Sequence, residues 1–112
     1  MIKIYCLFDV RNKTPRYIGT TKLLLYDRLI QHLNGSSKGN TKKDQWIRSV
    51  GKDNIGIRFI SDCFPDERQE TEREYIQLYS NFDLVNTALL ESEKGSLKEY
   101  LRKGKNGRNV KM

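Results

Sequence analysis

The sequence predicts a small α/β (α+β) domain in which helices flank a three-stranded, mostly antiparallel sheet. Three observations predict this fold class: apolar residues alternate over residues 2–8, recur with a helical period over residues 23–33, and alternate again over residues 55–59. The chain has 112 residues, which is room for one core of normal size. Leu, Ile, Val and Phe supply 29 of these residues, above the roughly one fifth below which disorder is expected.

The first half of the chain predicts a hairpin followed by a helix. Turn-forming residues at positions 9–15 separate the first strand from a second, short strand at residues 16–20. The helical period over residues 23–33 then predicts a helix, and the Gly- and Ser-rich residues 35–40 predict a flexible loop.

The second half predicts a short helix, a third strand and a longer helix. The short helix covers residues 44–50 and ends at Gly51, the strand covers residues 55–59, and the long helix covers residues 65–79. Pro65 suits the first turn of that helix, where its missing N–H is harmless. Residues 96–103 predict a last helix, followed by a polar basic tail that we expect to be mobile. We therefore predict a domain at residues 1–90 and a basic C-terminal helix and tail at residues 91–112.

Charge is divided into three blocks along the chain. The formal net charge is +7, with +8 in residues 1–58, −6 in residues 59–91 and +5 in residues 92–112. Two basic blocks favour a surface that binds a polyanion, with nucleic acid the first candidate, although a basic surface also serves solubility alone. No apolar run approaches the ~20 residues of a membrane span, and the two cysteines are too few for a disulfide scaffold. We expect a reduced, cytoplasmic protein that does not bind membranes.

The first long helix places two polar residues beside its apolar face. At 100° per residue, Arg28 and His32 lie one turn apart on one edge of the apolar arc. Side chains at such an edge can point into a cleft while the arc is buried. An arginine at the rim of the core and a locally bonded histidine are the structural alternative. The arc itself comprises Leu25, Tyr26, Leu29, Ile30 and Leu33.

The second long helix places one of its glutamates inside an apolar stripe. Glu72 shares the stripe with Ile76, whereas Glu70 and Glu74 lie on the opposite face. The rest of the stripe consists of Tyr75, Leu78 and Tyr79. A buried carboxylate must be paired with a cation, bound to a metal or protonated, because an unpaired one costs several kcal/mol. Glu72 is therefore the chemically interesting glutamate, with a structural salt bridge as the alternative.

The predicted hairpin carries a tyrosine on each strand. Tyr5 lies on the face opposite Ile4 and Cys6, and Tyr17 precedes Gly19 on the return strand. An antiparallel hairpin can place both rings on one face, although the sequence does not fix the register. Packing is the structural alternative for such a pair.

An ordered set of residues resembles the GIY-YIG nuclease family over roughly residues 2–88. The set consists of Lys3-Ile4-Tyr5, Tyr17-Ile18-Gly19, Arg28, His32, Glu72 ahead of Ile76, and Asn86 after Leu84-Val85. The chain departs from the family pattern at Lys3, where Gly is usual, and by one extra residue between Tyr17 and Arg28. Neither departure changes a functional side chain.

The resemblance implies a divalent-metal-dependent endonuclease of the GIY-YIG type, that is, a hydrolase of DNA phosphodiester bonds. It implies catalytic roles for Tyr5, Tyr17, Arg28, His32, Glu72 and Asn86. Glu72 would hold one Mg²⁺ (or Mn²⁺), since a single carboxylate with retained waters suits that ion. Arg28 would present its guanidinium to a phosphate oxygen. Tyr5 is our first choice as general base, with its pKa lowered by nearby cations, and an exchange of roles with His32 stays open. Asn86 would orient phosphate or metal-bound water.

Substrate binding is expected from two groups of basic residues. One group comprises Lys38, Lys42, Lys43, Arg48 and Lys52, and the other comprises Lys98, Arg102, Lys103, Lys105 and Arg108. Phosphate contacts of this kind are salt-sensitive and independent of sequence, so we expect low intrinsic specificity. One active site cuts one strand, and a double-strand break would need a homodimer, a larger oligomer or two encounters.

Three points stay open at this stage. The first is whether the substrate is DNA or RNA, duplex or single strand. The second is the setting, for which a phage, a mobile element, repair and restriction all fit. The third is whether the chain is a non-catalytic nucleic-acid-binding module on the same fold.

Overall fold

The computed structural model describes residues 1–86. The predicted helix at residues 96–103 and the basic tail at residues 91–112 lie outside the described residues, so the domain boundary expected at residue 90 stays a prediction. Within residues 1–86, no helix is both long enough and apolar enough to cross a membrane.

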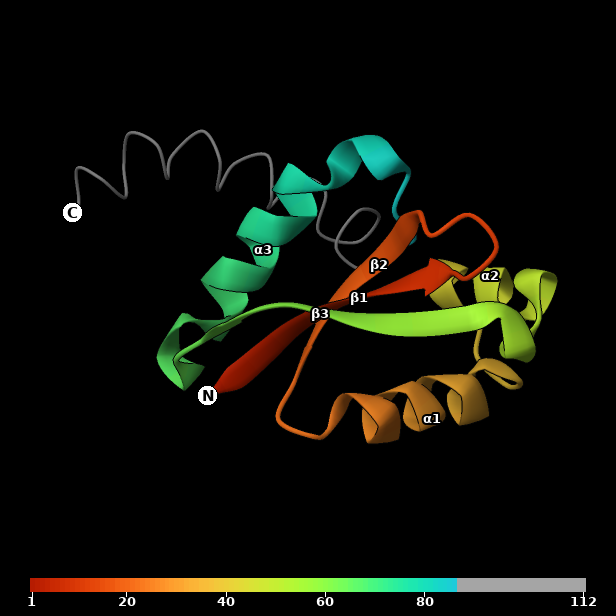
Figure 1. Cartoon of the computed structure of the whole chain (residues 1–112), viewed down its shortest axis with the longest axis horizontal. Helices are drawn as coiled ribbons and strands as arrows, with labels where there is room; N and C mark the ends of the chain where they lie inside the picture. The colour runs from red at the N-terminus through yellow and green to blue at the C-terminus, as the bar shows by residue number, and fades with distance from the viewer. Residues whose placement is uncertain (87–112) are drawn as a thin grey trace.

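Three antiparallel strands form the sheet, which confirms the predicted fold class (Figure 1). They are β1 (Ile2–Asp9), β2 (Pro15–Thr21) and β3 (Ile55–Cys63). The order is β2-β1-β3, so the first strand is central and β2 lies at an edge. β3 runs four residues beyond the expected end at Phe59, with a register shift opposite Ile4 and Tyr5.

Three α-helices and three short 3₁₀ segments complete the described residues. The helices are α1 (Leu25–Ser36), α2 (Lys42–Val50) and α3 (Arg68–Leu78). The 3₁₀ segments are η1 (Lys52–Asn54), η2 (Pro65–Glu67) and η3 (Ser80–Phe82). The hydroxyl of Thr41 caps α2 by accepting a hydrogen bond from the Asp44 amide at 3.1 Å. Gly51 ends α2 with a φ of 99°, a conformation that favours glycine.

The helices cover both faces of the sheet (Figure 1). Even-numbered side chains of β1, such as Ile4 and Cys6, pack with Ile76 of α3. Odd-numbered side chains, such as Tyr5 and Leu7, pack with α1 and α2 on the other face. The alternation of β1 therefore builds two small cores, one on each side of a central strand that is buried on both faces.

The buried face of α1 differs from the predicted apolar arc. Tyr26 is 70% and Ile30 is 36% exposed, whereas His32 is only 3% exposed. The helix is turned toward its Arg28–His32 edge because the hydroxyl of Tyr5 on β1 offers His32 a hydrogen bond, so this polar ring can be buried.

The face of α3 also differs from the prediction in part. Ile76 is buried, and Tyr75 and Tyr79 pack beside it, as expected. Leu78, which was placed in the apolar stripe, is 68% exposed. The stripe is therefore narrower than predicted, since α3 packs at the edge strand β2 and only one side of the helix faces the sheet.

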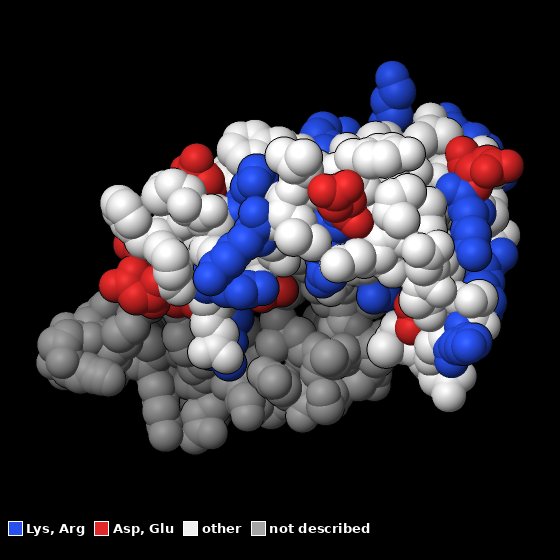
Figure 2. All heavy atoms as spheres, turned by 90° about the horizontal axis from the view of Figure 1, so that it is seen from below, with Lys and Arg blue, Asp and Glu red and all other residues white. Residues whose placement is uncertain are grey.

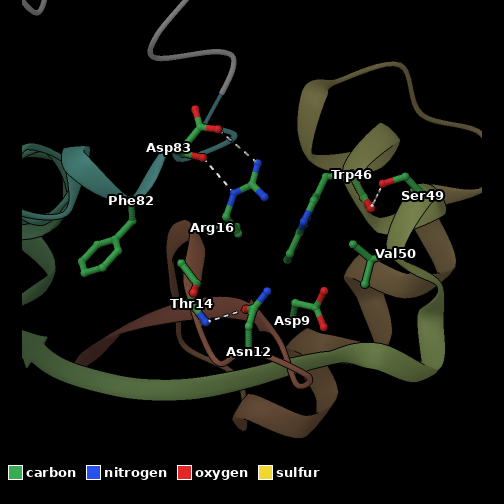
Figure 3. Close-up of a pocket in the computed structure, with 9 residues that line it drawn as sticks. All are labelled: Asp9, Asn12, Thr14, Arg16, Trp46, Ser49, Val50, Phe82 and Asp83. Atoms are coloured by element: carbon green, nitrogen blue, oxygen red, sulfur yellow. Dashed lines mark hydrogen bonds and ion pairs between the residues drawn. The ribbon is translucent and has the colours of Figure 1, made fainter.

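The segment after η3 is fixed to β2 by Arg16. Its Nε donates to the Asp83 carbonyl at 2.8 Å, and its guanidinium lies 5.7 Å from the centroid of the Trp46 ring. The Val85 amide donates to the Arg16 carbonyl at 2.6 Å. These groups border a pocket of about 310 Å³ between the hairpin turn, α2 and η3 (Figure 3). None of the predicted catalytic residues lines this pocket, but its contacts place residues 84–86 alongside β2.

Candidate active site

The hydroxyl of Tyr5 joins residues from two elements on the α1 face of the sheet. It lies 2.6 Å from Nε2 of His32 and accepts a hydrogen bond from Nε of Arg28 at 3.1 Å. Arg28 and His32 are four residues apart on α1, so the helix presents both to one point on β1. The three side chains therefore form one polar cluster, in which Arg28 and His32 share one edge of α1 as their helical spacing predicted.

Tyr17 completes the cluster from β2. Its ring meets the His32 ring edge-on, with 5.4 Å between centroids and 72° between the ring planes. The hairpin pairs Tyr5 with Gly19 and Leu7 with Tyr17, so the two tyrosines lie diagonally across neighbouring strands and on one face. The antiparallel hairpin thus realises the shared face that the sequence left open.

Gly19 leaves the space that the Tyr5 ring occupies. A Cβ atom at position 19 would lie 2.5 Å from the Tyr5 hydroxyl oxygen and 2.9 Å from Cε2 of Tyr17. Contacts this short do not occur at real Cβ atoms. The glycine therefore allows both rings to pack against the β2 backbone. Glycine is needed here because a side chain would not fit, and not because of an unusual backbone conformation.

Burial controls the pKa of the imidazole. Desolvation, with the positive charges of Lys43 and Arg28 added, lowers the pKa of His32 to about 3. His32 is therefore neutral at pH 7 and can accept a proton. Since arginine can only donate hydrogen bonds, the Tyr5 oxygen is the acceptor toward Arg28, and its own proton is available to His32.

Burial also raises the pKa values of both tyrosines. For Tyr5 the desolvation outweighs the hydrogen bond from Arg28, and for Tyr17 it outweighs the more distant Arg28 charge. We expected cations to lower the pKa of Tyr5; Arg28 and Arg68 do act in that direction, but burial outweighs them and the pKa is raised. Tyr5 therefore stays protonated at neutral pH in this arrangement.

Helix α3 brings Glu72 to the same cluster across the edge strand. Nε of Arg68 donates to Oγ1 of Thr20 at 2.7 Å, which ties the first turn of α3 to β2. Glu72 lies one turn further along and is half-buried, and its negative charge raises the pKa values of both Tyr5 and Tyr17. Glu70 and Glu74 are exposed, as expected. The carboxylate of Glu72 therefore lies close enough for its charge to act on both tyrosines.

Asn86 binds the main chain of β2 with both ends of its side-chain amide. Oδ1 accepts from the Ile18 amide at 3.0 Å, and Nδ2 donates to the Ile18 carbonyl at 2.7 Å. Asn86 is 6% exposed. We expected this amide to orient phosphate or water, but the structure uses it to hold β2 between Tyr17 and Gly19. Both ends of the amide are thus bonded to the main chain of β2.

The residues around Glu72 fit a hydrated magnesium-type ion. A hollow of about 430 Å³ is lined by Asp66, Arg68, Gln69, Glu72 and Pro65. No group of three or more His, Cys, Asp or Glu side chains within residues 1–86 could enclose a metal. The two carboxylates that line this open hollow, Asp66 and Glu72, suit a hard cation that keeps most of its waters better than zinc, which takes several protein ligands.

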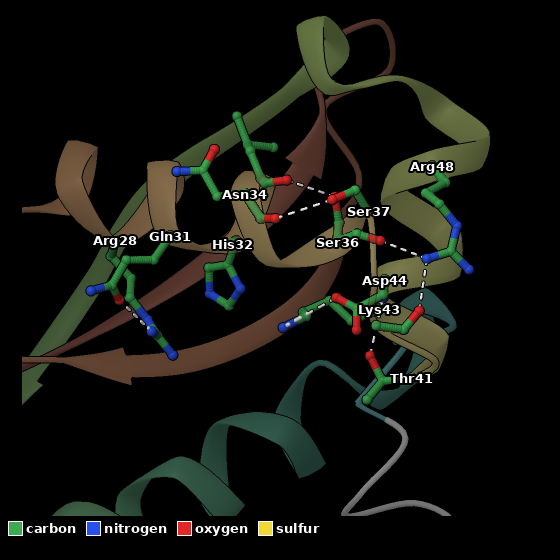
Figure 4. A network of polar contacts seen from close by, with 12 residues as sticks. Arg28, Gln31, His32, Asn34, Ser36, Ser37, Thr41, Lys43, Asp44 and Arg48 are labelled. Atoms are coloured by element: carbon green, nitrogen blue, oxygen red, sulfur yellow. Dashed lines mark hydrogen bonds and ion pairs between the residues drawn. The ribbon is translucent and has the colours of Figure 1, made fainter.

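Of the basic residues expected to bind substrate, those within residues 1–86 include exposed lysines and an arginine that is bonded to the main chain. Lys38, Lys42 and Lys52 are exposed. Arg48 instead donates from Nη1 to the carbonyls of Ser36 and Gly39, at 2.5 and 2.7 Å, and so holds the loop between α1 and α2 (Figure 4). Seen from the side of α1, many Lys and Arg side chains gather in two groups, and the mostly white area between them includes an acidic side chain (Figure 2). The second set of expected contacts, from Lys98 to Arg108, lies outside the described residues.

Two residues beside the cluster were not predicted as part of it. Lys43 of α2 was assigned to the basic surface, yet its ammonium lies 5.5 Å from the centroid of the Tyr17 ring. Nothing in the spacing of the chain indicates this contact. Arg68 has a positive charge that acts on Tyr5, and it precedes Glu72 by four residues, so the helical period could have found it.

Comparison with known proteins gives one match. The family model described as the GIY-YIG catalytic domain matches residues 1–86. No curated protein and no solved structure matches the chain. The matched range covers all the residues of the cluster.

Proposed function

Because this chain belongs to the GIY-YIG catalytic domain family, whose members are endonucleases, we propose that it is a divalent-metal-dependent endonuclease. The substrate that we propose is DNA, cut by hydrolysis of its phosphodiester bonds with low intrinsic sequence specificity. Membership of the family supports nuclease-type activity in general. The metal dependence, the DNA substrate and the low specificity are our proposals for this chain.

The observation that carries the proposal is the pair of contacts at the Tyr5 hydroxyl. One oxygen atom lies 2.6 Å from a neutral imidazole nitrogen and 3.1 Å from a guanidinium nitrogen. A base that can accept a proton and a fixed cation that can bind a phosphate oxygen thus meet at one hydroxyl. Purely structural hydrogen bonding does not require this combination of groups.

Tyr5 and His32 are proposed to activate the attacking water together. The water gives a proton to the Tyr5 oxygen while the Tyr5 proton moves to Nε2 of His32, so no tyrosinate has to form in the buried site. His32 ends this step as an imidazolium. The raised pKa of Tyr5 disfavours a free tyrosinate base, and the neutral imidazole of His32 leaves a ring nitrogen to receive the Tyr5 proton. Tyr17 holds the imidazole ring by its edge-on contact.

Arg28 and Glu72 are proposed to act on the phosphate. The guanidinium of Arg28 offsets the negative charge that the phosphate gains in the transition state. Glu72 would hold the divalent ion that nucleases of this family generally use, with Mg²⁺ or Mn²⁺ our choice. When bound, such an ion supplies Lewis-acid polarisation of the phosphate and of the leaving oxygen.

Substrate binding is proposed to come from the exposed lysines around α2, with the basic residues beyond position 90 as further contacts. Phosphate contacts position a backbone but do not read bases, so specificity would come from a partner or from the form of the DNA. A single site cuts one strand, and we propose that a double-strand break needs a second copy. A cytoplasmic location is part of the same proposal.

Cleavage assays test the proposal. The purified protein is incubated with supercoiled plasmid, single-stranded DNA and RNA, each with Mg²⁺, Mn²⁺ or EDTA. We expect nicked circles with either metal and none with EDTA. Binding of these nucleic acids without cleavage would identify a non-catalytic binding module and overturn the proposal, and cleavage confined to RNA would overturn the substrate.

A further inference from the structure

Lys43 reaches the cluster from α2, opposite Arg28 on α1. The side chain is half-buried, and Figure 4 shows it directed from α2 toward the side of α1 that carries His32. Its ammonium lies over the face of the Tyr17 ring, 5.5 Å from the centroid. The Tyr17 ring in turn touches His32 edge-on. Lys43 thus contacts the cluster through the Tyr17 ring and is only partly exposed.

The nearest acidic group, Asp44, explains this placement only in part. Oδ1 of Asp44 lies 3.7 Å from the Lys43 ammonium, at the long end of an ion pair. Neighbouring residues of a helix do not face each other, so such a pair is weak. The Asp44 side chain also packs closely against Gly39, which fixes it to the loop before α2. Lys43 is half-buried, whereas its neighbour Lys42 is exposed.

Two cations therefore flank one buried imidazole. Arg28 and Lys43 both disfavour the protonated form of His32, and the charge of Arg28 also disfavours the charged form of Lys43. The other groups that face His32 are the hydroxyl of Tyr5 and the ring of Tyr17. Two like charges within reach of each other in a half-buried place repel; Asp44 offsets part of the Lys43 charge, and a further anion between the two cations would relieve the repulsion more fully.

We propose that Lys43 is an active-site residue, and that its ammonium and the Arg28 guanidinium together bind the scissile phosphate beside the Tyr5–His32 pair. This inference rests on the proposed function. The phosphate adds negative charge beside the two cations, so its arrival makes the imidazolium of the proton relay easier to form. Lys43 thus couples substrate binding to the basicity of His32, which a lysine that merely attracts DNA to the surface would not do.

The kinetic test compares Lys43→Met with Lys42→Met, its exposed neighbour on the same turn. For Lys43→Met we expect kcat on plasmid DNA to fall on the order of 10²-fold, by analogy with loss of one charge-stabilising group, with partial rescue in Lys43→Arg. For Lys42→Met we expect a rise in KM that grows with salt. Equal effects of the two substitutions on KM, with kcat retained, would overturn the inference.

A second readout needs no cleavage. His32 is the only histidine of the chain, so its imidazole protons can be followed by NMR without assignment. We expect Lys43→Met to raise the pKa of His32, and inorganic phosphate to raise it in the wild-type protein but not in Lys43→Met. Identical titrations in all four samples would overturn the inference and leave the proposed function standing. Failure of the wild-type protein to cut any nucleic acid would instead overturn the proposed function.

Discussion

Substitution of Gly19 by alanine should separate the geometry of the cluster from the stability of the fold. The added Cβ would lie 2.5 Å from the Tyr5 hydroxyl oxygen and 2.6 Å from its Cζ, against an ordinary contact of at least 3.4 Å. The Tyr5 ring must therefore move by about 1 Å. Tyr5 is fully buried, so its ring has no open space to move into. The shift therefore changes the distance between the Tyr5 hydroxyl and Nε2 of His32.

Two magnitudes follow from that shift. Overpacking of this size typically costs about 1–3 kcal/mol, which a domain of this length can survive. A displacement of about 1 Å at reacting groups can cost on the order of 10² in rate. We therefore expect Gly19→Ala to fold, with a lowered urea midpoint, and to cut plasmid DNA about 10²-fold more slowly than the wild-type protein.

Gly35→Ala is the matched control. Gly35 lies in the last turn of α1, and a Cβ there would meet nothing within 4 Å. Because alanine favours the helix over glycine, we expect a gain of about 0.5–1 kcal/mol in the free energy of unfolding and unchanged cleavage. Wild-type cleavage by folded Gly19→Ala, with an unshifted His32 resonance, would refute the close-packing argument.

Three further predictions concern single residues. Glu72→Gln should abolish metal-dependent cleavage and leave DNA binding and the unfolding midpoint nearly unchanged; cleavage at the wild-type rate would end the assignment of Glu72 as metal ligand. Asn86→Ala should lower the free energy of unfolding by roughly 2 kcal/mol or more, because it leaves the buried amide and carbonyl of Ile18 without their partner, and a change within 0.5 kcal/mol in urea titration would contradict this. The imidazole of His32 should show no titration between pH 5 and 8, since its folded pKa is about 3. The unfolded chain takes up this proton near pH 6.5 and the folded chain does not, so stability is full above pH 6.5 and falls below it, by up to about 1.4 kcal/mol per pH unit. His32→Gln should remove that slope.

Local pattern predicted the elements and the candidates for the site. Alternation placed Tyr5 opposite Ile4 and Cys6, and the helical period placed Arg28 and His32 on one edge, because both periods are geometric consequences of backbone structure. The order of the motifs along the chain predicted membership of the GIY-YIG family, and the family-model match confirms it. These inferences need no knowledge of distant contacts.

Contacts between distant segments could not be predicted in the same way. The inward turn of Lys43 depends on how α2 is placed against β2, and the exposure of Tyr26 depends on the hydrogen bond that lets His32 be buried. We expected Asn86 to orient phosphate or water because the sequence shows that an amide is present but not what it bonds to. Its partner, Ile18, lies 68 residues earlier in the chain. The pKa of Tyr5 was misjudged for the same reason, since burial outweighs the one cation that the helix revealed.

Replacement of Tyr5 by phenylalanine tests the central claim most directly, because it removes only the oxygen atom that His32 and Arg28 share. The measurement is the single-turnover rate of plasmid nicking with Mg²⁺, with DNA binding and thermal unfolding measured on the same samples. We predict a folded protein that binds DNA as the wild type does and nicks it at a rate lower by on the order of 10²–10⁴. Nicking at the wild-type rate by this variant would contradict the account.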